Sequence, residues 1–294
     1  MPRVTARGIT LEYDSFGSPS HRPLLLVMGL GAQMIHWDDA FCEGLARRGH
    51  HVIRFDNRDS GLSTRFEAAA VPDMGALVTQ LMSGQQPAVP YTLDDMAGDA
   101  FGLLDALEVE RAHIAGASMG GMIVQAMAIL RPERVRTLTS IMSSTGNPAL
   151  PPASPEAMAA LTSPVPADLD GYLRRSLEVA RVIGSPGFPF DEARSRERAR
   201  LAFERGIYPQ GTARQMAAIV AHGNRRPRLE QLEIPALVIH GSADPLVPVH
   251  GGRDTLEALR GAEWLEIEGM GHDLPPGTWE PITEAISRLT ERHH

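Results

Sequence analysis

A serine stands between small residues in the segment Gly116-Ala117-Ser118-Met119-Gly120. A Gly-x-Ser-x-Gly segment suits a sharp turn from a strand into a helix, because glycine relieves the crowding around the exposed serine. A serine hydroxyl is a weak nucleophile at neutral pH, so it needs a basic side chain and an acid that orients this base. Short patterns of this kind also arise by chance, and glycines often serve only a packing turn. The segment gains weight because it joins a predicted strand at 112–117 to a predicted helix at 119–130.

Two later loops contain the partners that such a serine needs. Asp244 follows a predicted strand at 236–240, and His272 follows a predicted strand at 264–268. Alone, Asp244 would be read as a helix cap and His272 as a solvated loop residue. Loops that leave the carboxyl ends of parallel strands meet at one edge of the sheet, however. We therefore predict a catalytic triad of Ser118, Asp244 and His272.

The oxyanion of a tetrahedral intermediate, which attack by a serine would form, also needs two backbone N–H donors. The turn at Ser118, called a nucleophile elbow, provides Met119 N–H at the start of a helix, and the dipole of this helix favours negative charge. The second donor should come from the turn Met28-Gly29-Leu30-Gly31, which follows a predicted strand at 24–28. We predict an oxyanion hole formed by Leu30 and Met119.

The elements around these residues alternate between strands and helices. Apolar runs predict strands at 24–28, 51–56, 112–117 and 135–142, and helical periodicity fills 37–48, 92–107 and 119–130. Further strands at 236–240 and 264–268 alternate with helices near 254–259 and 279–289. This order predicts an α/β fold with a mostly parallel central sheet and helices on both faces.

The alternation stops between the fourth and fifth of these strands. Residues 147–166 contain six prolines and predict an irregular link, and 168–222 show helical patterns alone. We predict a core of residues 1–142 and 232–294 with a helical cap at 143–231. By position in the cap, we predict a substrate-binding wall whose alternative is ordinary packing: Tyr208, Gln215, Met216 and Ile219. The Arg- and Glu-rich stretch 191–205 predicts a solvated helix face.

Composition excludes several classes of protein. The chain of 294 residues has no lysine, which excludes a Walker A loop and a Schiff-base lysine, and no cofactor or metal motif was found. The formal charge of −8 and the scattered arginines disfavour nucleic acid as a partner. Cys42 is the single cysteine and is expected in the core. Without an apolar run of membrane length or a signal peptide, we expect no membrane association and a cytoplasmic location. His293 and His294 resemble the stub of a purification tag and are set aside.

The chain resembles the α/β-hydrolase superfamily, and more closely the aclacinomycin methylesterase-like bacterial carboxylesterases. The elbow, the Asp and His loops and the helical insertion carry the first resemblance. The closer one rests on 25–29 (LLVMG), 51–61 (HVIRFDNRDSG), 235–239 (PALVI) and 267–272 (IEGMGH). It implies a small-molecule ester substrate and an acyl-enzyme, with Ser118 attacking, His272 accepting its proton and Asp244 holding the imidazole. Met28-Gly29 replaces the His-Gly of many superfamily members but agrees with the closer esterases.

Alternatives remain at this stage. The same triad would serve a lactonase or a carbon–carbon bond hydrolase, and the scaffold would also serve a non-catalytic ligand-binding protein. Gly29-Leu30-Gly31 with Asp56 would suit a dinucleotide site, but Met34 occupies the third glycine position. Arg58 and Asp59 are expected to form a structural ion pair or loop anchor. No sequence pattern sets an oligomeric state.

Overall fold

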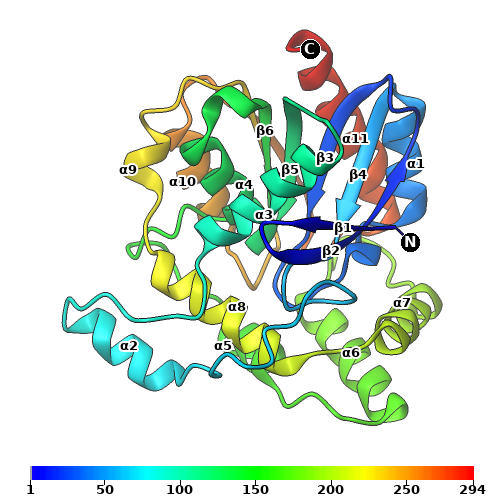
Figure 1. Ribbon diagram of the computed structural model, residues 1–294. Helices are drawn as coiled ribbons and strands as arrows, with labels where there is room; N and C mark the ends of the chain where they lie inside the picture. Colours follow the sequence, from blue (N-terminus) through cyan, green and yellow to red (C-terminus); the bar gives the residue numbers. More distant parts are fainter. Residues whose placement is uncertain (1) are drawn as a thin grey trace.

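A central sheet organises the computed structural model, which describes residues 2–294 (Figure 1). Within these residues the sheet has eight strands in the order β1-β2-β4-β3-β5-β6-β7-β8. Pairing is parallel from β4 to β8 and antiparallel in β1–β2 and β2–β4, so the predicted mostly parallel α/β fold is confirmed. The strands are β1 Arg3–Ala6, β2 Ile9–Phe16, β3 Arg22–Val27, β4 His50–Phe55, β5 Ala112–Ala117, β6 Val135–Ile141, β7 Ala236–Gly241 and β8 Glu263–Ile267.

Each face of the sheet is covered by its own layer of helices. In β3, Leu25 and Val27 pack with residues of α3 and α4, while Leu24 and Leu26 pack with residues of α1 and α11. This alternation follows from the two-residue period of a strand, and burial on both faces explains its continuous apolar run. Helix α10 contacts β7. The bounds of these helices are α1 Asp39–Arg47, α3 Leu93–Ala106, α4 Met119–Leu130, α10 Val249–Ala258 and α11 Pro276–Arg292. Two short 3₁₀ turns are η1 Met34–His36 and η2 Pro132–Arg134.

Five helices separate β6 from β7 in the chain. They are α5 Pro155–Thr162, α6 Leu169–Ile183, α7 Glu192–Arg205, α8 Pro209–His222 and α9 Arg226–Leu229. Figure 1 shows α5 to α8 gathered beyond one end of the sheet, near α2 (Met74–Met82), whereas α9 lies beside α10. The sequence did not predict β1, β2 or α2. None of the helices within residues 2–294 is long and apolar enough to cross a membrane.

The proline-rich link is only partly irregular. Helix α5 begins inside it, with Ser154 as the N-cap and Pro155 in the first turn. Proline is tolerated there because the first amide of a helix has no partner within the helix. The prediction of an irregular link was therefore wrong for residues 155–162.

Candidate active site

Ser118 lies at a strained turn between β5 and α4. Its backbone has φ 57° and ψ −120°, a conformation that non-glycine residues rarely adopt. A Cβ atom at position 116 would lie 2.1 Å from Gly120 O, and one at position 120 would lie 2.0 Å from Val27 O. Both flanking glycines are thus required by the tight crossing of strand and helix. Ser143 Oγ also donates a hydrogen bond of 2.8 Å to Ser118 O, which helps to hold the strained backbone.

The structure brings the three predicted triad residues into one hydrogen-bonded chain. His272 Nε2 lies 2.9 Å from Ser118 Oγ, and His272 Nδ1 lies 2.7 Å from Asp244 Oδ2. Because a carboxylate accepts from N–H, the Nδ1 proton faces Asp244 and leaves Nε2 able to accept the serine proton. Asp244 and His272 are buried, while Ser118 is half-buried. This arrangement can generate a serine nucleophile.

Asp244 is held as an anion by its surroundings. Burial acts to raise its pKa, but the nearby rings of His272 and His240 and the hydrogen bonds from His272 and Val247 N outweigh burial. The pKa of this carboxyl therefore lies well below its usual range. The other oxygen, Oδ1, accepts from the amides of Leu246 and Val247 at 2.9 and 2.8 Å, which fixes the carboxylate plane.

The loop that carries His272 is hydrogen-bonded to the end of α6 and to the segment that follows it. His272 N donates to Ile183 O at 2.6 Å, and Gly271 N donates to Ser185 Oγ at 2.8 Å. The carboxylate of Asp273 accepts from Ser185 Oγ, whereas the His272 ring bonds to Asp244. The helical segment between β6 and β7 thus helps to position the backbone of the His272 loop.

The turn after β3 lies directly against the serine. A Cβ atom at Gly29 would be 3.1 Å from Ser118 Cβ, which leaves room for glycine alone without a shift. Neither Leu30 N nor Met119 N donates a hydrogen bond to another group within residues 2–294. Met119 follows the serine directly, and Leu30 follows Gly29, so both amides belong to residues next to the contact between the turn and the serine.

The four predicted wall residues lie in α8 or, for Tyr208, at its N-cap, and their surroundings differ. Met216 is half-buried, and Ile219 packs against the core cluster. The Tyr208 hydroxyl accepts from Arg214 at 2.9 Å, and its ring stacks with Arg214 and Arg65.

Gln215 requires a correction. It has no exposed surface, and both polar atoms of its amide are bonded to backbone of the loops after β3 and β4, at Gly31 N and Arg58 O. It therefore joins two loops and does not line a wall. Glutamine on a helix gives no sequence signal for such a role.

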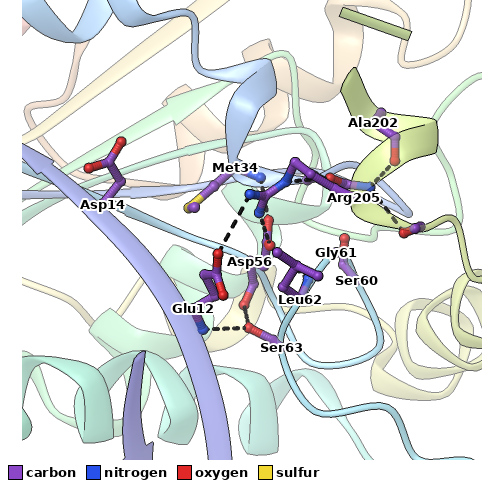
Figure 2. A network of polar contacts seen from close by, with 12 residues as sticks. Glu12, Asp14, Met34, Asp56, Ser60, Gly61, Leu62, Ser63, Ala202 and Arg205 are labelled. Atoms are coloured by element: carbon purple, nitrogen blue, oxygen red, sulfur yellow. Dashed lines mark hydrogen bonds and ion pairs between the residues drawn. The ribbon is translucent and has the colours of Figure 1, made fainter. Parts of the chain in front are cut away.

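A second polar cluster joins α7 to the core and was not predicted (Figure 2). Buried Asp56, just after β4, accepts from Met34 N at 2.7 Å and Leu62 N at 3.0 Å, and pairs with Arg205. Arg205 also donates from Nε to Gln33 Oε1 at 2.8 Å. The prediction of a solvated face for 191–205 is wrong at Arg205, whose side chain is 14% exposed. Asp56 is thus engaged by the protein itself, which argues against the dinucleotide alternative.

Arg58 and Asp59 form structural ion pairs, as expected, but with distant partners. Arg58 pairs with Asp99, and Asp59 pairs with Arg214 of α8 and accepts from Tyr91 at 2.7 Å.

Cys42 is buried, and burial raises the pKa of its thiol to about 12, consistent with a core residue. Within residues 2–294 no three His, Cys, Asp or Glu side chains are grouped to hold a metal ion.

Comparisons with known proteins agree with this architecture. A family model described as alpha/beta hydrolase fold matches residues 22–275. Rhodomycin D methylesterase DauP of Streptomyces sp. (strain C5) is 32% identical, over 98% of this chain and 97% of its own. 3-Oxoadipate enol-lactonase 2 of Acinetobacter baylyi is 26% identical, over 97% and 96%. The solved structure of an enol-lactonase from Burkholderia xenovorans LB400 is alike in fold, with a TM-score of 0.71 at 24% identity over 99% of this chain and 100% of that one.

Proposed function

Because the chain belongs to the α/β-hydrolase family, we propose that it is a serine hydrolase that cleaves carboxylic esters of small molecules through an acyl-enzyme. The observation that carries this proposal is the chain of hydrogen bonds from Ser118 Oγ through His272 to Asp244. The likeness to a methylesterase along nearly the whole chain supports the ester as substrate.

Acylation begins when Ser118 Oγ attacks the carbonyl carbon of the ester and its proton passes to His272 Nε2. The carbonyl oxygen becomes an oxyanion, which Leu30 N–H and Met119 N–H stabilise. Asp244 stays ionised beside the imidazolium and keeps its Nδ1 proton in place. Collapse of the intermediate breaks the C–O bond of the ester, and His272 gives its proton to the departing alcohol.

Deacylation repeats these steps with water. His272 removes a proton from the water as it attacks the acyl carbon, and the same two amides receive the second oxyanion. The C–O bond to Ser118 then breaks, the serine regains its proton from His272, and the carboxylic acid leaves. A lactone is a cyclic ester and opens by the same steps, so the enol-lactonase relative is compatible with this chemistry.

Residues 143–231 act in this proposal as a cap over the core formed by 1–142 and 232–294. The hydrogen bonds that His272 N and Gly271 N donate to Ile183 O and Ser185 Oγ support this role, because they join the segment to the loop of the proposed base. Met216, Ile219 and Tyr208 of the cap are the proposed substrate contacts.

The direct test is covalent labelling of the serine. Wild type treated with a fluorophosphonate should gain the mass of a single adduct, and Ser118→Ala should gain none while keeping its fold by circular dichroism. Ser118→Ala should also lose turnover of a short-chain ester by several orders of magnitude. Turnover at the wild-type level in this variant would remove Ser118 from the mechanism.

A panel of substrates then separates the chemical classes. Methyl esters, short-chain alkyl esters, lactones and vinylogous diketones should be compared by kcat/KM with the same enzyme. We expect esters to be favoured. A labelled serine with turnover of diketones alone would assign carbon–carbon bond cleavage, and a folded chain with neither label nor turnover would favour a ligand-binding protein.

A further inference from the structure

We propose that Gln215 of α8 is a positioning residue that completes the oxyanion hole, so that the helical cap sets the alignment of Leu30 N–H. This inference rests on the proposed function. The Gln215 amide hydrogen-bonds to Gly31 N and Arg58 O and not to Ser118 or His272. Residues of both the core and the cap would therefore shape the oxyanion hole.

The amide of Gln215 fits two loops at once. Its Oε1 accepts from Gly31 N at 2.8 Å, and its Nε2 donates to Arg58 O at 2.7 Å. The side chain has no exposed surface, so water does not compete for either bond. A buried amide of this kind has one satisfied orientation, because exchange of O and N would set donor against donor and acceptor against acceptor.

The turn at 28–31, which carries Leu30 N–H, depends on this contact at Gly31, its most adaptable residue. The core holds the turn at both ends, through Asn57 Nδ2 to Met28 O and Ser60 Oγ to Ala32 O, each at 2.9 Å. Between them Gly31 has φ +64°, and glycine has access to several backbone conformations there. The hydrogen bond from Gly31 N–H to Gln215 orients the peptide that joins Leu30 to Gly31. This peptide adjoins the one that carries Leu30 N–H, whose carbonyl, Gly29 O, accepts from Ala32 N at 3.3 Å.

Helix α8 also packs closely against the loops after β3 and β4. Arg214, the neighbour of Gln215, forms a buried ion pair with Asp59 in the loop after β4. A Cβ atom at Gly211 would lie 2.4 Å from Asp59 O, and one at Gly31 would lie 2.7 Å from Thr212 Oγ1. The helix is therefore in close contact with both loops, and a shift of the helix would break the bond from Gly31 N to Gln215.

The test replaces the glutamine by an apolar side chain of similar length. Gln215→Met should lower kcat by about 10- to 100-fold with little change in KM, because a misaligned donor weakens the transition state and not substrate binding. Affinity for a trifluoromethyl ketone should fall in parallel, since Ser118 Oγ adds to its carbonyl carbon and leaves an oxyanion in the hole. Gln215→Asn, which is shorter but polar, should change both in the same direction and serves if the methionine variant fails to fold.

A matched control separates the turn from the helix as a whole. Gln86 Nε2 donates to Ala221 O at the far end of α8, at 3.2 Å, so Gln86→Leu removes a glutamine contact to the same helix. It should leave kcat and ketone affinity at the wild-type level. The fluorophosphonate adduct should still form on Gln215→Met, because the serine and its base remain.

The outcomes are distinct. Folded Gln215 variants with unchanged kcat and ketone affinity would overturn the inference and leave the ester hydrolase intact. A rise in KM alone would also overturn it, because Gln215 would then act on substrate binding. A wild type that takes no adduct and turns over no ester would overturn the proposed function itself.

Discussion

The reactivity proposed for Ser118 depends on one buried carboxylate. Asp244 gives one oxygen to His272 Nδ1 and the other to two backbone amides, so its orientation is fixed from both sides. Its depressed pKa means that it remains ionised across the pH range in which most proteins are folded. Loss of activity on mild acidification should therefore come from another group, not from protonation of Asp244.

Asp244→Asn should lower kcat by roughly 10⁴-fold, because an amide no longer fixes the imidazole in the tautomer that accepts the serine proton. Steady-state kinetics on one ester measures this loss. Asp273→Asn is the matched control, since Asp273 is the next carboxylate along and bonds to Ser185 Oγ. A loss of about 10⁴-fold in the Asp273 variant, together with an active Asp244→Asn, would assign the orienting role to Asp273.

At the scale of elements, α7 is joined to the sheet by its last residue. Arg205→Met would leave Asp56 buried without its cation, and burial already raises the pKa of that carboxyl. The variant should lose about 3–5 kcal/mol of unfolding free energy, measured by urea denaturation. Arg200→Met on the same helix removes exposed pairs with Glu197 and Glu204 and should cost no more than about 1 kcal/mol. Equal losses in the two variants would contradict a special role for Arg205.

Helices α7 and α8 show what the sequence can predict and what it cannot. The strand–helix turn at Ser118, the turn at 28–31 and the loops of Asp244 and His272 follow from local patterns, because each strand and the turn after it are adjacent in the sequence. Arg205 and Gln215 look like ordinary helix residues, and their partners lie 149 residues away at Asp56 and 184 away at Gly31. The place of β2 in the sheet likewise depends on its pairing with β4, which no local period reveals.

At the scale of the whole molecule, several histidines are buried far from the triad. Burial is the main cause that lowers the pKa of His50 to about 4 and those of His113 and His222 to about 3. His50 bonds to Leu45 O and Thr290 Oγ1, where α1 and α11 meet the sheet. Each of these side chains is therefore neutral in the folded protein at mildly acidic pH.

This burial predicts how stability depends on pH. Below the ordinary pKa of 6.5 these histidines bind protons in the unfolded chain but not in the folded protein. Acid therefore favours unfolding until the pH reaches the pKa values of the folded state. The unfolding free energy should be highest above pH 6.5 and fall by about 2 kcal/mol per buried histidine at pH 5. Urea denaturation at pH 7 and pH 5 measures the fall, and His113→Gln should reduce it where exposed His250→Gln does not. A flat profile between these pH values would mean that the three histidines take up protons in the folded state as readily as in the unfolded chain.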